Sequence, residues 1–358
     1  MSIPASRSST AVRMVTGLFH QPYVWAIVAL ILLLIVNLTK NPGYLGVSVN
    51  PATGNLSGNV IDILRASAPI MMIAVGMTLV IATRGIDLSV GSVMAVAGAV
   101  SMEFMNNTGT GSFGTAIVAV LLALGISAVL GTLNGILVSI VGLQPFITTL
   151  VMMLAGRGLA KVITSGQNTS ATNESFRWIA NGTFLGFPVV FVIAVLIVAV
   201  LAALVRRTAL GLMIESIGIN PKAARMAGIR PVGILVSVYI VSAVLAGVAG
   251  IFSTASVMTV EVAKTGMTAE MDAILAVVIG GTSLAGGKFS LTGSIIGALL
   301  IATLDKTIVY MSIPSSATPA FKAIVIVIIC LLQSPRVRSM FNRRRTRVII
   351  AEKETVQA

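Results

Sequence analysis

The chain has 358 residues, of which 56% are hydrophobic and 10% are charged, and its formal net charge is +13. A soluble domain carries about a quarter charged residues, so this composition excludes an ordinary soluble protein and indicates a polytopic membrane protein. The basic residues lie between or after the apolar segments and do not form a groove interleaved with aromatic residues. This distribution fits the positive-inside rule and argues against a nucleic-acid partner.

The first apolar run, residues 23–36, is either the core of a signal peptide or an uncleaved membrane span. No convincing small-residue cleavage site follows it, which favours a span. His20 is the only histidine and Cys330 the only cysteine. These counts exclude an intrachain disulfide and a zinc site of the usual ligands, and we expect no metal and no cofactor.

Ten apolar segments follow one another, and we expect each to be a transmembrane helix. They are residues 23–40, 67–83, 88–105, 115–140, 143–163, 185–205, 231–256, 271–283, 289–309 and 320–334. Several are shorter than the roughly 20 residues that a straight span needs. The second, third, eighth and ninth are broken by glycine-rich turns, which are tolerated at membrane depth only where protein or a water-filled cavity covers them. The predicted fold class is an all-α membrane protein of about ten helices, some interrupted.

The charge distribution predicts the orientation. With the N-terminus inside, 16 of the 24 Lys and Arg residues fall on the inner side, so we expect both termini in the cytoplasm of a multi-pass protein of the cell membrane. The expected organisation is a cytoplasmic segment 1–22, a transmembrane domain 23–334 and a basic cytoplasmic tail 335–358. Residues 59–68 have amphipathic spacing and lie either along the outer surface or in a solvated loop helix.

Two segments hint at an internal repeat. Residues 80–99 and 278–298 each consist of an apolar run, a glycine-containing polar turn and a run of small residues. We expect a weak inverted repeat, since interrupted segments at corresponding places in two halves are typical of transporters. Small residues elsewhere are expected to let helices pack closely; these are Gly125, Ser127, Gly131, Gly135, Gly247 and Gly250.

Residues 206–230 form an extended polar segment with a strong basic bias between two apolar runs. Its basic residues are Arg206, Arg207, Lys222, Arg225 and Arg230, and only Glu215 opposes them. Asn220 and Pro221 are a good helix start, and Gly228 suits the left-handed residue that ends a helix. The segment therefore predicts a capped helix of about two turns on the inner side of the membrane.

The sequence carries no readable catalytic site. No phosphate-binding loop of the Walker type is present; residues 280–290 are glycine-rich, but their spacing is wrong and they predict a tight turn between spans. With one histidine outside the spans, a serine nucleophile has no base, so an intramembrane enzyme is disfavoured.

Charged residues are expected mainly at the ends of spans; these are Asp87, Glu103, Asp272, Asp305 and Lys306, while Arg157 and Lys161 fall inside one. Ion-coupled carriers usually keep a carboxylate in mid-membrane, so the sequence argues against ion coupling. Energy for transport would then come from another protein, and residues 206–230 are the natural contact.

Two places are candidates for a translocation path or gate. Asp87 is either a polar anchor at a gate or an N-cap for the following helix, and the N-cap is favoured. Gln144, Pro145 and Phe146 begin a span, and Gln144 is a candidate for lining a polar path.

Four segments taken together resemble the permease subunits of bacterial ABC importers for monosaccharides, of the ribose, galactose and galactofuranose type. They are GMTLVIATRGIDLSVGSVMA (76–95), LQPFITTLVMMLAGRGLA (143–160), TALGLMIESIGINPKAARMAGI (208–229) and DAILAVVIGGTSLAGGKFSLTGSIIGALL (272–300). The resemblance covers nearly all of residues 60–335. Within this family the chain looks most like galactofuranose permeases and the related actinobacterial fructose permeases.

The resemblance implies a type II-like ABC importer permease fold and a non-catalytic transport subunit. Two permease chains, identical or paired with a paralogue, would form the path, two ATPase domains would dock beneath them, and an external binding protein would deliver the sugar. The positions that match the family's cytoplasmic coupling segment are Glu215, Gly218, Asn220, Ala223, Ala224, Gly228 and Ile229, with Arg225 in the same stub. One residue departs from the family's usual T-G-G-I-D-L-S: Arg84 replaces the second glycine and adds a charge, so the backbone of that turn is not carried over.

The implied substrate is a monosaccharide such as galactofuranose, fructose or ribose. Branched-chain amino acid permeases are distant relatives of the same broad class and give the alternative substrate. An ion-coupled secondary carrier is the alternative mechanism.

Overall fold

The computed structural model describes residues 22–49, 56–109, 111–314 and 316–333. The predicted basic tail 335–358, His20 and almost all of the predicted N-terminal segment lie outside the described residues.

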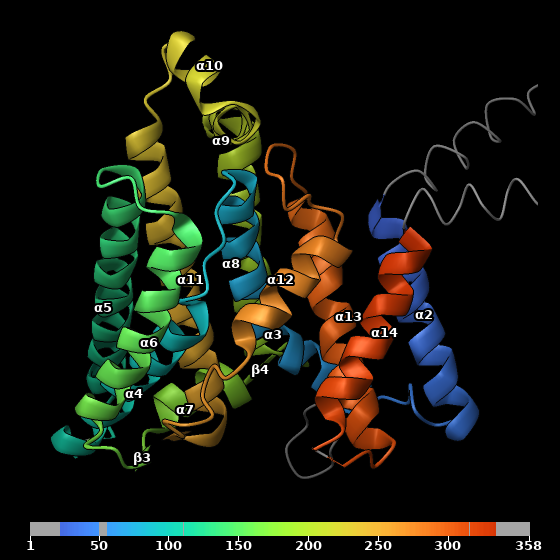
Figure 1. Cartoon of the computed structure of the whole chain (residues 1–358). Helices are drawn as coiled ribbons and strands as arrows, with labels where there is room; N and C mark the ends of the chain where they lie inside the picture. Colours follow the sequence, from blue (N-terminus) through green and yellow to red (C-terminus); the bar gives the residue numbers. More distant parts are fainter. Residues whose placement is uncertain (1–21, 50–55, 110, 315, 334–358) are drawn as a thin grey trace, which may run out of the picture.

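In the part of the chain that the structure describes, each predicted apolar segment overlaps a helix (Figure 1). These helices are α2 (Pro22–Lys40), α3 (Asn59–Ala82), α4 (Val90–Thr108), α5 (Phe113–Ser139), α6 (Pro145–Ile163), α8 (Val189–Arg207), α11 (Pro231–Val257), α12 (Ala269–Ile279), α13 (Leu291–Tyr310) and α14 (Thr318–Gln333). Within the described residues, 7 helices are long and apolar enough to cross a membrane, namely α2, α3, α5, α6, α8, α11 and α13. Of the other three, α4 becomes polar in its last turn, and α12 and α14 have only 11 and 16 residues. The all-α membrane class is confirmed.

Short elements connect these helices. Three short helices are α7 (Glu174–Asn181), α9 (Leu210–Ile219) and α10 (Pro221–Met226). Two-residue strands form three antiparallel pairs: β1 (Ser48–Val49) with β2 (Leu56–Ser57), β3 (Thr169–Ser170) with β6 (Thr259–Val260), and β4 (Thr183–Phe184) with β5 (Phe187–Pro188).

The two ends of the bundle differ. Helices α9 and α10 lie at one end, beyond the ends of α5 and α6 (Figure 1). We call this the inner end and the opposite one the outer end. Helix α2 begins and helix α14 ends at the inner end (Figure 1).

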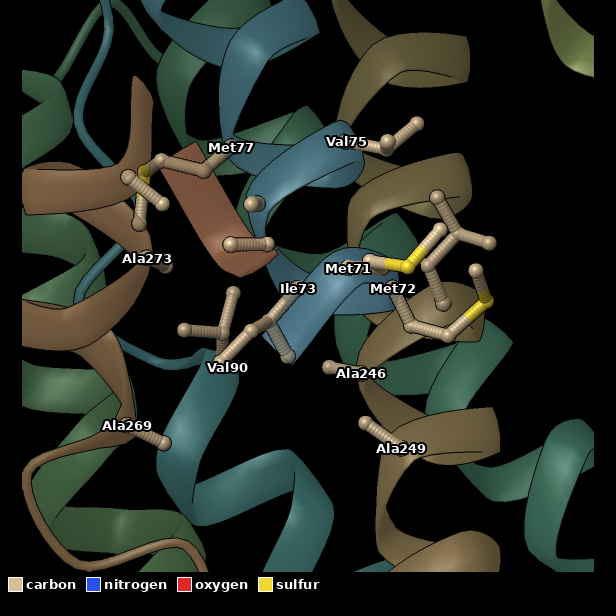
Figure 2. Close-up of a cluster of buried hydrophobic side chains, with 14 of the residues drawn as sticks. Met71, Met72, Ile73, Val75, Met77, Val90, Ala246, Ala249, Ala269 and Ala273 are labelled. Carbon is tan, nitrogen blue, oxygen red and sulfur yellow. The ribbon is translucent and has the colours of Figure 1, made fainter. Parts of the chain in front are cut away.

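Helix α3 is the centre of the bundle. Its apolar window is 72% buried, against 11% for α2, and it packs against α8, α11, α12 and α13. Figure 2 shows methionines 71, 72 and 77 of α3 beside small residues of neighbouring helices, among them Ala246 and Ala249 of α11 and Ala273 of α12. Flexible methionine side chains fill the irregular gaps, while alanines let the backbones approach. Among the seven candidate spans, α3 is therefore the one most completely removed from lipid.

Helix α2 lies at the edge and packs against α13 and α14. Its lipid-facing residues include Leu32, which is 52% exposed. A buried polar contact joins it to the bundle: Asn37 Nδ2 donates a hydrogen bond of 2.8 Å to Thr307 Oγ1 of α13, and both residues are buried. A buried side-chain hydrogen bond between helices fixes their register in an apolar environment.

Close packing at the predicted small residues is confirmed at most positions. A Cβ added to Gly131 or Gly135 of α5 would lie 2.7 or 2.8 Å from backbone atoms of α11, and Gly247 and Gly250 of α11 are equally crowded. Gly125 differs, because a Cβ there would meet nothing within 4 Å. Gly131, Gly135 and Gly247 lie where α5 and α11 touch, and Gly250 lies where α11 touches α4.

Two expectations about the chain's organisation are wrong. Residues 59–68 are neither a surface helix nor a loop helix, since they continue through Pro69 as part of α3. The repeat is not inverted, because the turn after α3 and the turn after α12 meet at the inner end, where Gly287 N donates to Ala82 O at 2.9 Å. Helices α3 and α12 therefore run in the same direction.

We expect Gly131→Ala to destabilise the protein by about 1–2 kcal/mol, because the methyl group must push α5 away from α11. Gly125→Ala is the matched control, and we expect it to be neutral or stabilising by up to about 1 kcal/mol through helix propensity. Thermal unfolding in detergent micelles measures both. Equal effects of the two substitutions would contradict the assigned helix contact.

Candidate functional site

The predicted stub at residues 220–228 is confirmed as a capped helix. Asn220 Oδ1 accepts hydrogen bonds from Lys222 N and Ala223 N at 3.0 and 3.1 Å, and Pro221 is the first residue of α10. Gly228 has a φ of 84°, the left-handed conformation that glycine adopts without strain. With 6 residues, α10 is shorter than the two turns predicted.

The stub presents an exposed, partly apolar surface at the inner end. Met226 is 91% exposed, and Leu212 and Ile219 of the preceding α9 are 70% and 59% exposed. Ala223 and Arg225 are also exposed, whereas Ala224 is buried against the rest of the segment. An exposed apolar patch next to basic side chains and beyond the bundle is typical of a surface that binds a protein.

Gly218 packs α9 closely against the bundle, and Glu215 of the same helix lines a hollow. Gly218 is buried, and a Cβ there would overlap Ala82 O of α3 and Gly287 N of the turn before α13. Glu215 lines a hollow of about 280 Å³ together with Arg206 of α8 and Phe289. Arg206 itself donates to Thr292 Oγ1 at 3.1 Å. The exposed stub is therefore attached through α9 to α3, α8 and the start of α13.

Asp87 lies in the turn before α4, at a span end as predicted, and it is buried inside the bundle. Its Oδ1 accepts hydrogen bonds from Ser89 N at 3.0 Å and Ser89 Oγ at 2.5 Å, and its Oδ2 accepts from Ser242 Oγ at 2.9 Å. Ser242 is near the middle of α11, and Asp87 is fully buried. The favoured N-cap is wrong in detail, because Ser89 is the cap residue of α4 and Asp87 precedes it.

Further polar groups surround this carboxylate. Asn134 Nδ2 of α5 donates to Ser89 Oγ at 2.9 Å, and Thr149 Oγ1 of α6 donates to Ile86 O at 3.0 Å. Among the described residues, Tyr239 OH and Asn134 Oδ1 are buried without a hydrogen-bond partner. The turn at residues 83–89 thus joins α4, α5, α6 and α11, and a buried carboxylate is its centre.

The other path candidates do not join Asp87. Gln144 precedes α6 and Pro145 is its first residue, so the predicted helix start is confirmed. Gln144 is exposed, and Phe146 is 47% exposed. In the single chain these side chains lie on the outside of the bundle.

A cavity of about 610 Å³ opens at the outer end, and sequence reasoning did not find it. Its walls are the first turns of α3, the last turns of α11 and the loop that follows β6. Polar side chains that line it are Asp62, Arg65, Ser253, Ser256, Glu261 and Lys264. Arg65 Nε is buried with no partner among the described residues. The amphipathic spacing of residues 59–68 is the only sequence signal of this wall, and it predicts a segment along the outer surface or a solvated loop helix instead.

The loop after β6 is held from the other side by Arg157 of α6. Its Nη1 and Nη2 atoms each donate a 2.6 Å hydrogen bond, to Thr265 O and Gly266 O respectively. A Cβ on Gly266 would overlap Gly91 O of α4. Arg157 therefore fixes one wall of the outer cavity, which explains a charge inside a span.

Comparison with known proteins identifies the family. The model of the branched-chain amino acid transport system / permease component family matches residues 59–332. The chain belongs to this family. Fructose import permease protein FruF of Bifidobacterium longum is 52% identical over 349 residues, which are 96% of this chain and 97% of the relative.

Two further relatives are also sugar permeases. The galactofuranose transporter permease protein YtfT of Escherichia coli is 41% identical over 90% of this chain and 92% of its own length. The ribose import permease protein RbsC of Escherichia coli is 37% identical over 87% of this chain and 93% of its own length. No solved structure matches the permease. The resemblance read from the four sequence segments is confirmed, and the permease is a multi-pass membrane protein.

We expect Asp87→Ala to lower stability by about 2–4 kcal/mol, because it leaves buried hydroxyl and amide donors of Ser89 and Ser242 without an acceptor. Asp87→Asn keeps one acceptor oxygen and should cost less. The measurement is thermal unfolding in detergent micelles, with Glu174→Ala, an exposed substitution in α7, as a control expected within about 0.5 kcal/mol of the parent. An unchanged unfolding temperature for Asp87→Ala would show that this network does not stabilise the bundle.

Proposed function

We propose that this chain is the membrane-spanning subunit of an ATP-driven importer and that it carries a monosaccharide, with fructose the first candidate. The observation that carries the proposal is the 52% identity to a fructose import permease over 96% of this chain. The name of the matching family refers to branched-chain amino acids, but FruF, YtfT and RbsC are named for sugars. The subunit itself is non-catalytic in this proposal, and partner chains hydrolyse ATP.

The proposed orientation puts the inner end in the cytoplasm. Helix α2 begins and helix α14 ends there, at the same end of the bundle as the basic segment 206–230 (Figure 1). The positive-inside rule supports this assignment. The transmembrane domain is then residues 23–334, with segments 1–22 and 335–358 in the cytoplasm and the cavity facing outward, toward a sugar-binding protein.

The stub α10 is the proposed contact with an ATPase subunit. Its exposed Met226, Ala223 and Arg225 form a small apolar and basic surface, and Gly218 connects α9 directly to α3. A displacement of α10 would therefore be transmitted to the central helix α3 through close backbone contacts rather than through long flexible side chains.

The outer cavity is the proposed first part of the sugar path. Its volume of about 610 Å³ falls in the range of small-molecule sites. Serine hydroxyls, two carboxylates and two cationic side chains offer the mixture of donors and acceptors that sugar hydroxyls need. Gln144, Pro145 and Phe146 belong to the path in this proposal only where a second permease chain covers that face of α6.

The test of the assembly is a gentle-detergent purification of the tagged chain from its own membranes, with partners identified by mass spectrometry. An ATPase and a sugar-binding protein are expected to co-purify, together with either a second copy or a paralogue. Reconstituted liposomes should then take up radiolabelled fructose only with ATP.

Because Asp87 is a buried carboxylate, an ion-coupled carrier is the second candidate. Uptake by the chain alone that an ionophore abolishes would replace the proposal with that one.

We expect Arg225→Glu and Ala223→Trp each to reduce sugar uptake by at least about 10-fold, because they reverse a charge and insert bulk at the centre of the proposed contact. Membrane abundance, measured by immunoblot, should stay unchanged because both positions are exposed. Lys161→Glu, an exposed charge reversal at the outer part of α6, is the control and should leave uptake unchanged. Uptake that survives in both stub variants would remove α10 from the coupling surface.

We expect Arg65→Ala to reduce uptake by about 10-fold, since the substitution removes cationic donors from the cavity wall. Lys40→Ala, at the exposed end of α2, removes a positive charge from the same side of the membrane and should have no effect. Initial rates across a range of sugar concentrations measure both variants. Parent-like rates for Arg65→Ala at every concentration would argue against the outer cavity as part of the path.

A further inference from the structure

Arg84 occupies a backbone position that would ordinarily favour glycine. It follows Thr83, the C-terminal cap of α3, and has a φ of 65°. Its amide donates to Ile81 O at 2.9 Å, and the amide of Gly85 donates to Val80 O at 3.0 Å. This is the left-handed closure of a helix, at which any side chain with a Cβ is strained. The reason for an arginine here therefore lies in its side chain.

The guanidinium group joins two segments that are distant in sequence. Its Nε donates to Ala285 O in the turn between α12 and α13 at 3.0 Å. Its Nη2 donates to Ile219 O, the last residue of α9, at 2.8 Å. The planar fork of an arginine can hold two carbonyl groups at fixed separation, which the flexible single ammonium group of a lysine does not reproduce.

The same three segments are also in backbone contact. Gly287 N donates to Ala82 O at 2.9 Å, and Gly218 has no room for a Cβ between them. The Arg84 side chain lies directly against Gly286, where an added Cβ would overlap Arg84 Cγ. Gly286 and Gly287 have φ values of 82° and 90°, so the turn can take this shape only because it is made of glycine.

The three segments lead to the two functional regions. Ile219 immediately precedes Asn220, which caps the exposed stub α10. Helix α3 leads from Ala82 to Asp62 and Arg65 in the wall of the outer cavity. Helix α12 begins directly after the loop that forms another wall of that cavity and ends at the turn that Arg84 holds.

We propose that Arg84 is a positioning residue that makes α9, the inner end of α3 and the turn between α12 and α13 move as one body. A displacement of α10 is then passed to α3 and α12 together, and both reach the outer cavity. The inference deepens the proposed function and rests on it, because it names the residue that links the partner surface to the sugar path.

The test compares Arg84→Gly with Ser165→Gly. Ser165 follows the C-terminal cap of α6 at the outer end and has a φ of 51°, so it is a matched left-handed position away from the three segments. In Arg84→Gly the backbone conformation is kept without strain and both side-chain hydrogen bonds are lost. Arg84→Lys keeps the charge and loses the fork.

The first measurement is hydrogen–deuterium exchange of the purified chain in detergent micelles. Arg84→Gly is expected to raise exchange of the amides of residues 210–226 by about 10-fold, the change expected from loss of a hydrogen bond to a charged donor. Exchange in α5 and α11 should stay unchanged, which shows that the bundle is still folded. Ser165→Gly should have no effect on residues 210–226, and Arg84→Lys should lie between the parent and Arg84→Gly.

The second measurement is the number of ATP molecules hydrolysed per labelled fructose imported, in liposomes with the co-purified partners. Arg84→Gly should raise this ratio about 5- to 10-fold, because hydrolysis continues while the displacement no longer reaches the cavity. A merely structural defect would lower both rates and leave the ratio unchanged. Parent-like exchange together with a parent-like ratio would overturn the proposal.

Absence of ATP-dependent uptake in the unsubstituted chain would instead refute the proposed function. The exchange measurement would still decide whether Arg84 holds the three segments together.

Discussion

The structure depends on the contact between two non-helical turns, one after α3 and one before α13. In an apolar environment every backbone donor and acceptor must find a partner within the protein. Gly287 N meets this demand by donating to Ala82 O, and Gly218 lets α9 approach the same two groups. The breaks after α3 and before α13 are therefore tolerated, because a backbone group at one break is the hydrogen-bond partner of a backbone group at the other. This arrangement also brings α9, which precedes α10 at the inner end, into close contact with the end of α3.

Charged side chains of the bundle likewise find partners within the protein. Lys322 of α14 contacts Asp272 of α12 at 3.0 Å and Asp305 of α13 at 2.8 Å, and Lys306 contacts Asp62 at 2.6 Å. Lys322 and Asp272 are each 17% exposed, and removal of one partner of such a largely buried pair is strongly unfavourable. Asp62 is 45% exposed, so its pair with Lys306 contributes less. Such pairs connect specific helices to one another.

Features that depend on residues close together in the sequence could be predicted, whereas features that depend on residues far apart in the sequence could not. The caps of α10 were predictable, because Asn220, Pro221 and Gly228 act on amides within a few positions of themselves. The start of α3 was missed, since Asp62 and Arg65 lower the hydropathy of a stretch that is nevertheless helical. The surroundings of Asp87 were not predictable, because its partner Ser242 lies 155 positions later. For the same reason the outer cavity, which is formed by α3, α11 and the loop after β6, has no signature in any single segment.

The edge position of α2 bears on how the protein is made. Its buried polar anchor, Asn37, donates a hydrogen bond to Thr307, 270 positions downstream. Ribosomes add about 5–20 residues per second, so this asparagine is synthesised roughly 15–50 s before its partner exists. During that interval the first span resides in lipid with an amide group that has no final acceptor. The bundle is therefore completed only when the last helices are synthesised and pack beside the first. Truncation of α13 or α14 would leave α2 without its packing partners, even though α2 itself was inserted correctly.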